Sequence, residues 1–144
     1  MFDSILVVCT GNICRSPMAE RRLRQLLPSK KIDSAGVKAL VDSTADETAV
    51  LTAELHDVSL DGHKGRQFTQ KIGSQYDLIL VMEKRQIEYV TRIASEVRGK
   101  TLLLGHWLDQ KEIPDPYHQS NEVFDFVYQL IDQACQSWVV KLGG

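Results

Sequence analysis

Short apolar runs alternate with helical patterns along the chain, and this alternation constrains the fold more than any other feature. Residues 4–8 (SILVV) are typical of a strand buried on both faces, and further strands are expected at 31–36, 76–82 and 100–104. Strands that alternate with helices predict an α/β fold, a three-layer αβα sandwich around a central four-stranded parallel sheet. Ligands are then expected beyond the carboxyl ends of the strands.

The expected helices have start signals. Ser16 and Pro17 look like an N-cap followed by proline at the first helical position, and apolar residues then recur at helical spacing. Asp46 is expected to cap a second helix over 47–56, and residues 84–94 to form a third. The last helix is predicted by the spacing of Val123, Phe126, Val127, Leu130, Ile131, Ala134 and Trp138.

Composition points to one soluble domain over residues 1–144, with 43% hydrophobic and 25% charged residues. The net charge of -2 gives no general reason to expect a nucleic-acid partner. The start, MFDSILVVC, lacks a basic n-region and a long apolar run, so we expect no signal peptide, no stable membrane insertion and a cytoplasmic location. Three cysteines in such a chain predict reduced thiols.

The segment CTGNICRSP, residues 9–17, joins the first expected strand to the first expected helix. A glycine-bearing loop that leads into a helix N-terminus presents several backbone N–H groups to one point, which suits a phosphate. The same N–H groups and Arg15 would stabilise a thiolate, so we expect Cys9 to be ionised at neutral pH. The pattern G-x-x-x-x-G-K-[ST] of nucleotide-binding loops does not occur. The sequence therefore predicts a phosphate-binding loop with a nucleophile between the first strand and the first helix.

Four motifs together point to one family. A C-x5-R-S loop is present as Cys9, TGNIC, Arg15 and Ser16, and it is accompanied by DSAG at 33–36, YDLILVME at 76–83 and IPDPY at 113–117. In these motifs the chain resembles the low-molecular-weight protein tyrosine phosphatases, over essentially its whole length. It looks most like the bacterial branch associated with tyrosine autokinases of exopolysaccharide and capsule production. The resemblance implies that the substrate is a phosphotyrosine protein, namely a membrane tyrosine autokinase of polysaccharide export. It implies no metal or other cofactor.

The resemblance also implies roles for individual residues. Cys9 would be the nucleophile, Arg15 the phosphate clamp and Asp115 the general acid. Hydrogen bonds that support the loop would come from Asn12, Ser16 and Ser34. The expected substrate-binding residues are Thr10, Gly11, Asn12, Ile13, Cys14, Ser16, Leu40 and Tyr117.

The apolar groups among these residues favour phosphotyrosine. Ile13, Leu40 and Tyr117 would wall a slot for an aryl ring, and a phenol leaves more easily than a serine alkoxide. In the resemblance, threonine at the position of Ile13 accompanies phosphoarginine enzymes, whereas isoleucine accompanies tyrosine phosphatases. Leu40 departs from family members that carry an aromatic residue near this rim, which leaves the preference along that wall open.

Several residues have alternative interpretations. Cys14 is either an inert loop thiol or the partner of Cys9 in a reversible disulfide that prevents overoxidation. Asp115, between two prolines, could instead initiate a turn. His63 is expected to be structural and Cys135 to pack in the core. A solvated helix face, able to steer acidic phosphopeptides, is expected from Arg21, Arg22 and Arg24.

Two other functions share the same loop. A thiol-dependent arsenate reductase of this fold needs further redox cysteines after the loop, but YDLILVMEKRQIEYV has none and Cys135 stands alone. A non-catalytic phosphotyrosine-binding module would keep the loop without the chemistry, and the presence of Cys9, Arg15 and Asp115 argues against it.

Overall fold

The sheet has four parallel strands, as the sequence predicts. The computed structural model describes residues 2–143. The strands are β1 (Ser4–Cys9), β2 (Lys31–Gly36), β3 (Leu78–Val81) and β4 (Thr101–Leu103), in the spatial order β2-β1-β3-β4. Every adjacent pair is parallel, and Cys9 at the end of β1 pairs with Gly36 at the end of β2.

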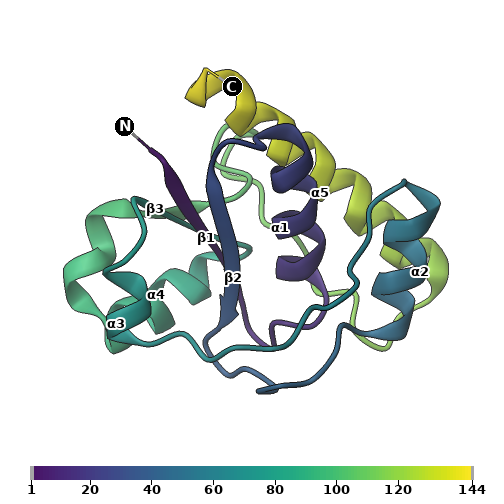
Figure 1. Cartoon of the computed structure of the whole chain (residues 1–144), viewed down its shortest axis with the longest axis horizontal. Helices are drawn as coiled ribbons and strands as arrows, with labels where there is room; N and C mark the ends of the chain where they lie inside the picture. The colour runs from purple at the N-terminus through teal and green to yellow at the C-terminus, as the bar shows by residue number, and fades with distance from the viewer. Residues whose placement is uncertain (1, 144) are drawn as a thin grey trace.

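Helices cover both faces of this sheet, which confirms the three-layer αβα sandwich. One face carries α1 (Arg15–Leu26), α2 (Glu47–Leu55) and α5 (Asn121–Leu142), while α3 (Gln70–Gly73) and α4 (Lys84–Ile93) lie on the other (Figure 1). A 3₁₀ helix, η1 (Ser95–Lys100), follows α4. The two short helices α3 and η1 were not predicted, because four to six residues are too few to show helical periodicity.

Alternate residues of β1 enter two separate cores. Ile5, Val7 and Cys9 pack in the core beneath α1, α2 and α5, whereas Leu6 and Val8 pack in the core on the opposite face. This alternation follows from the two-residue period of a strand. Cys9 is the last residue of the buried series and is 3% exposed. The sulphur-bearing residue therefore stands where the core ends and the loop begins.

The predicted start of the first helix is wrong. The helix begins at Arg15, Cys14 occupies the N-cap position without a side-chain hydrogen bond, and Ser16 and Pro17 lie within the first turn. The hydroxyl of Ser16 does not cap because it lies 2.9 Å from the Cys9 sulphur. The predicted cap of the second helix is confirmed, since the Asp46 carboxylate accepts hydrogen bonds from the N–H groups of residues 48 and 49.

The carboxyl end of β1 and the loop to α1 lie at the end of the molecule opposite the chain termini (Figure 1). This is the edge of a parallel sheet at which ligands are expected. Within residues 2–143, no helix combines the length and the apolar character that crossing a membrane requires.

Candidate active site

The loop after β1 turns its carbonyl oxygens outward. The carbonyl oxygens of the five consecutive residues 9–13 accept hydrogen bonds of 2.6 to 3.0 Å, and the donors are Val37 N, Lys38 N, Leu40 N, His63 Nε2 and Asp46 N, in that order. In a trans peptide the C=O and the following N–H point in opposite directions. The N–H groups of residues 10–14 therefore face the inside of the loop. Such a ring of N–H groups forms a binding site for an anion.

The sulphur of Cys9 lies inside this ring. The backbone N–H of Asn12 donates to Sγ over 3.3 Å, and the Ser16 hydroxyl oxygen lies 2.9 Å from the same sulphur. The N-terminus of α1 follows directly, and its dipole also favours negative charge here. Hydrogen bonds to the charged form of a group favour that form. The geometry is thus suited to a reactive thiolate.

Asn12 holds the loop in shape and has a positive φ of 60°, a conformation that asparagine tolerates better than most residues. Its side-chain amide donates to Ser16 Oγ over 2.7 Å and to Ser34 Oγ over 3.0 Å. Its Oδ1 accepts from the backbone N–H of Arg66 over 2.9 Å. The two other predicted supporting residues, Ser16 and Ser34, therefore both contact Asn12.

His63 completes the support of Asn12, a role that the sequence did not reveal. The imidazole is buried, and its Nε2–H donates to the Asn12 carbonyl oxygen over 2.6 Å. Burial lowers the pKa of His63, although the bond to Asn12 opposes this effect. The neutral ring suffices for this bond because a carbonyl oxygen needs only one donor. The expectation that His63 is structural agrees with this position.

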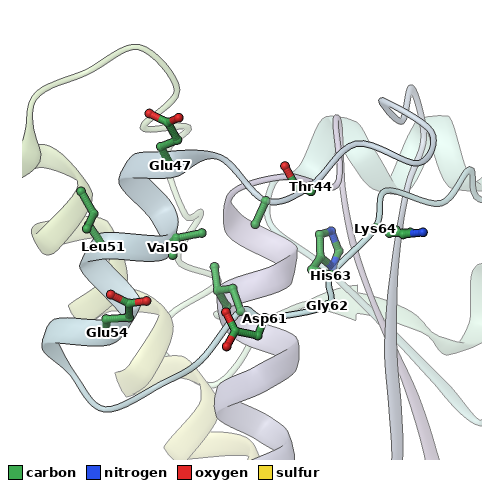
Figure 2. Close-up of a pocket in the computed structure, with 11 residues that line it drawn as sticks. Thr44, Glu47, Val50, Leu51, Glu54, Asp61, Gly62, His63 and Lys64 are labelled. Carbon is green, nitrogen blue, oxygen red and sulfur yellow. The ribbon is translucent and has the colours of Figure 1, made fainter.

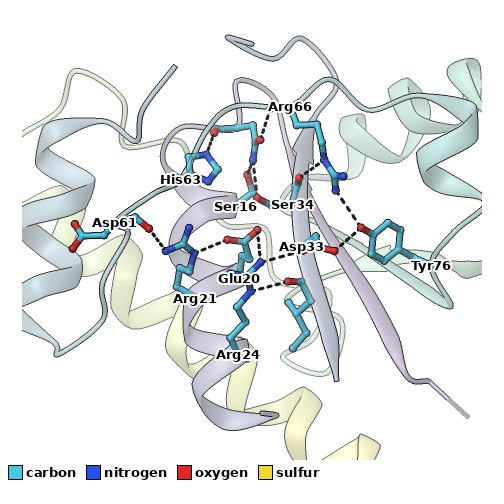
Figure 3. A network of polar contacts seen from close by, with 12 residues as sticks. Ser16, Glu20, Arg21, Arg24, Asp33, Ser34, Asp61, His63, Arg66 and Tyr76 are labelled. Atoms are coloured by element: carbon cyan, nitrogen blue, oxygen red, sulfur yellow. Dashed lines mark hydrogen bonds and ion pairs between the residues drawn. The ribbon is translucent and has the colours of Figure 1, made fainter. Parts of the chain in front are cut away.

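The basic face of α1 is less solvated than the sequence suggests. The side chain of Arg21 is 17% exposed and bonds to Glu20 over 2.8 Å, and that of Arg22 is 24% exposed and bonds to Asp132 over 2.6 Å. Arg24 is 44% exposed and lies 3.0 Å from Asp33. Part of this network connects to the residues behind the loop (Figure 3). The expectation of a free, solvated cationic face is therefore wrong for Arg21 and Arg22, because buried or half-buried carboxylates hold both guanidinium groups.

Arg15 is the most buried cation of the site, at 2% exposure. Its Nη1 donates to Glu83 Oε2 over 2.6 Å and to the carbonyl oxygen of Ile113 over 2.8 Å. Its Nη2 lies 3.9 Å from Asp115 Oδ2. The guanidinium is thus anchored through one nitrogen and directs the other toward Asp115. Sequence reasoning missed Glu83, which belongs to the motif YDLILVME but has no isolated signal of its own.

Asp115 takes part in a turn and also faces the site. Its Oδ1 accepts from the backbone N–H of Tyr117 over 3.0 Å, which is the local bond of an Asx turn. The side chain is nevertheless 48% exposed, and Oδ2 faces Arg15. Both interpretations of Asp115 from the sequence are therefore compatible with one geometry.

These groups surround a cavity of about 240 Å³. The residues that line it are Cys9, Thr10, Gly11, Asn12, Ile13, Cys14, Arg15, Lys38, Leu40, Asp115 and Tyr117. Ser16, expected as a substrate-binding residue, is not among them because it lies beneath the sulphur and is fully buried. Lys38 was missed, since a lone lysine in a loop carries no motif. Its Nζ lies 4.9 Å from the centre of the Tyr89 ring.

The two remaining cysteines are buried free thiols. Burial raises the pKa of Cys14, and the negative charge of Asp46 adds to this effect. Burial likewise raises the pKa of Cys135, which lies fully buried on α5 as expected of a packing residue. Among residues 2–143, no three His, Cys, Asp or Glu side chains cluster in a way that could hold a metal ion.

A family model agrees with this geometry over almost the whole chain. The model described as low molecular weight phosphotyrosine protein phosphatase matches residues 4–143. The chain belongs to this family. The resemblance stated from the four motifs is therefore confirmed, and with it the assignment of the chain to a family of enzymes.

Relatives of this phosphatase family are similar in both sequence and structure. The low molecular weight protein-tyrosine-phosphatase Etp of Escherichia coli (strain K12) is 57% identical, over 98% of this chain and 95% of Etp. The crystal structure of the tyrosine phosphatase Wzb from Escherichia coli K30 in complex with sulphate has a TM-score of 0.97 and 64% identity, over 99% of each chain. Vibrio vulnificus Wzb in complex with benzylphosphonate has a TM-score of 0.96 and 52% identity, over 98% of this chain and 99% of that one.

Proposed function

We propose that this phosphatase-family chain hydrolyses phosphotyrosine in proteins through a phosphocysteine intermediate. The observation that carries the proposal is the position of the Cys9 sulphur within the ring of inward N–H groups, in one cavity with Arg15 and Asp115. The N–H groups and Arg15 would bind the three oxygens of a phosphoryl group placed there. The bond from phosphorus to the leaving oxygen would then lie in line with the sulphur. The family membership supports the same reaction.

In the first step the Cys9 thiolate attacks phosphorus, so that an S–P bond forms while the bond from phosphorus to the tyrosine oxygen breaks. Asp115, protonated at this stage, gives its proton to the departing phenolate oxygen. The support for Asp115 as the acid is that its half-exposed carboxyl lines the cavity and lies 3.9 Å from Arg15 Nη2. The products of this step are a neutral tyrosine and the phosphocysteine.

In the second step the Asp115 carboxylate takes a proton from water, and the resulting hydroxide oxygen attacks phosphorus. The S–P bond breaks, the electron pair returns to the sulphur as thiolate, and inorganic phosphate leaves. Arg15 binds two phosphoryl oxygens in both steps with its planar guanidinium, which resists displacement because Glu83 and the Ile113 carbonyl oxygen hold it. No step uses a metal ion.

The shape of the cavity supports an aryl phosphate as substrate. Ile13, Leu40 and Tyr117 are among the residues that line it. Leu40 and Tyr117 are 47% and 39% exposed, so both still offer apolar surface to an incoming ring. Burial of an aromatic ring between such groups adds binding energy that a phosphoserine side chain cannot supply.

We infer further that the physiological substrate is phosphotyrosine on a membrane tyrosine autokinase of polysaccharide export, reached from the cytoplasm. The motifs shared with the bacterial branch of the family support this inference. The similarity to proteins named Etp and Wzb, at 57% and 51% identity, is consistent with the same branch. The substrate would present its phosphotyrosines on a chain segment accessible to the cavity.

The test is release of phosphate, in EDTA, from a phosphotyrosyl peptide and from its phosphoseryl counterpart. We expect release from phosphotyrosine to be lost in Cys9→Ser and to fall by about 10²–10⁴-fold in Asp115→Asn, the usual range for loss of an acid–base group. Activity that survives Cys9→Ser would contradict the proposed nucleophile. Binding of the peptide without turnover by the intact, reduced protein would instead indicate a binding module.

Arsenate reduction is the less favoured alternative. Beyond the loop, the remaining cysteine of the chain is Cys135, whose Sγ is buried in α5 at 3.9 Å from the carbonyl oxygen of Ala19. A thiol in this position is not available to relay electrons from the loop to a reductant. Sustained turnover of arsenate with thioredoxin and its reductase would contradict this interpretation.

A further inference from the structure

A second, larger cavity of about 570 Å³ lies beside the active site and has no part in the proposed chemistry. It is bounded by α2 on one side and by the segment 60–64 on the other (Figure 2). Its apolar surface comes from Ala45, Val50, Leu51 and Leu60. We call it the α2 groove.

The rim of the α2 groove is acidic. Glu47 and Glu54 reach it from α2 and Asp61 from the opposite segment (Figure 2). Among the described residues, these three carboxylates have no salt-bridge partner, and Lys64 is the cation that lines the groove with them. His63 contributes no compensating charge near neutral pH because burial lowers its pKa. The groove therefore combines an apolar floor with a net negative rim.

One tight turn separates the groove from the catalytic cavity. Leu40 lines the catalytic cavity, whereas Thr44 and Ala45 line the groove. The N–H of Ser43 donates to the carbonyl oxygen of Leu40 over 3.1 Å, which closes a turn between them. The top of this turn exposes apolar surface, with Leu40 47% and Val41 58% exposed. A bound chain that leaves the catalytic cavity over this turn would thus reach the groove.

We propose that the α2 groove docks a second segment of the substrate protein, in which apolar side chains stand next to lysine or arginine. The proposal rests on the proposed function and specifies how that substrate is selected. Apolar side chains match the floor, and the cations match the three carboxylates of the rim. A β-turn spans less than ~7 Å and an extended chain covers ~3.3 Å per residue, so crossing the turn takes about two residues and the docked segment begins beyond them.

The experiment compares phosphotyrosyl peptides that share one neutral core. After a three-residue spacer, the core is extended on either side by Lys-Leu-Arg-Leu or by Gln-Ser-Gln-Ser, and kcat and KM are measured for each peptide. On one of the two sides of the core, we expect the basic apolar extension to lower KM about tenfold relative to the neutral extension, with little change in kcat. This is the effect of one modest additional contact. The advantage should shrink at high salt because exposed charges are screened.

Matched variants assign the effect to the groove. The double variant Glu47→Gln/Glu54→Gln should lose most of the KM advantage. The control double variant Glu96→Gln/Asp109→Asn removes two exposed carboxylates outside the groove and should keep it. Hydrolysis of p-nitrophenyl phosphate, which is too small to reach the groove, should be the same in both double variants and in the original chain.

Three results would overturn the docking proposal. These are equal KM values for the basic and neutral extensions in the original chain, an advantage that survives in the groove variant, or a concentration-dependent dimer that the groove variant abolishes. Failure to hydrolyse p-nitrophenyl phosphate and the core peptide would contradict the proposed function instead. Docking is then still tested by fluorescence anisotropy of the same extended peptides with phenylalanine in place of phosphotyrosine.

Discussion

Glu83 Oε2 lies 2.6 Å from Arg15 Nη1, although the two residues are 68 positions apart in the chain. The Glu83 side chain is 18% exposed and that of Arg15 is 2% exposed, so the pair is largely shielded from water. Glu83 stands two residues after the end of β3 and Arg15 begins α1. The ends of β1 and β3 therefore bring together Arg15, the proposed phosphate clamp, and the group that fixes its orientation.

Replacing Glu83 should impair catalysis more than substrate binding. Glu83→Gln keeps the shape but removes the charge that holds the guanidinium. In the proposed mechanism Arg15 stabilises charge in the transition state, so we expect kcat to fall about tenfold or more. Arg85→Gln is the control, since Arg85 bonds the other oxygen of Glu83 over 3.1 Å but is 65% exposed. Unchanged kcat in Glu83→Gln would show that Ile113 and the loop suffice to orient Arg15.

The Ser16 hydroxyl should sustain the reactivity of the nucleophile. Ser16→Ala removes the group 2.9 Å from the Cys9 sulphur and the acceptor of the Asn12 amide. We expect slower alkylation of Cys9 by iodoacetamide and a kcat reduced by about 10-fold, because one hydrogen bond to the sulphur is lost. Ser137→Ala on α5 removes a hydroxyl that bonds within its own helix, to the carbonyl oxygen of Ala134, and should leave both rates unchanged.

Gly36 should not accept a side chain. A Cβ at Gly36 would lie 2.5 Å from the Thr10 carbonyl oxygen and 3.1 Å from Asn12, so the loop would have to move. We expect Gly36→Ala to lower the free energy of unfolding by about 1–3 kcal/mol and to reduce activity more than stability alone explains. Gly99→Ala is the matched control, because a Cβ there has no neighbour within 4 Å. Equal urea midpoints for the two variants would contradict the steric argument.

His63 should make stability depend on pH. Burial lowers the pKa of His63 from its ordinary value of 6.5, so the folded state binds fewer protons than the unfolded state just below that pH. Its contribution to the free energy of unfolding is therefore fully present above pH 6.5 and decreases as the pH falls through 6.5 toward the lower folded-state pKa. The reason is that protonation is easier once the chain unfolds.

The measurement is urea unfolding of the original chain and of His63→Gln between pH 5 and 8. The difference between the two proteins at pH 8 reports the contact with the Asn12 carbonyl oxygen. We expect this difference to shrink on acidification, because only the original chain has an imidazole to protonate at this position. A difference that stays constant across the range would show that His63 titrates alike in both states.

The alternation of apolar runs and helical patterns was sufficient to predict the fold. The central strands β1 and β3 are buried on both faces, so their residues form nearly continuous apolar runs. Element ends were less predictable. The helix after the loop starts at Arg15 and not after Ser16, because the loop needs the Ser16 hydroxyl for the sulphur. Local capping rules do not include such a competing partner.

Cys9 and Arg15 were candidates from the sequence because they share one loop of local spacing, whereas Asp115 was a candidate through the family resemblance, since its Pro-Asp-Pro setting by itself also predicts a turn. By itself, the sequence determined the parallel α/β sheet, the family and the candidate residues Cys9, Arg15 and Asp115. Only the tertiary structure decided that Glu83 and His63 complete the site, and that an acidic groove lies beside it. The physical reason is that these contacts join segments 51 to 68 residues apart, and no local pattern encodes which distant side chain will satisfy a buried charge or carbonyl group.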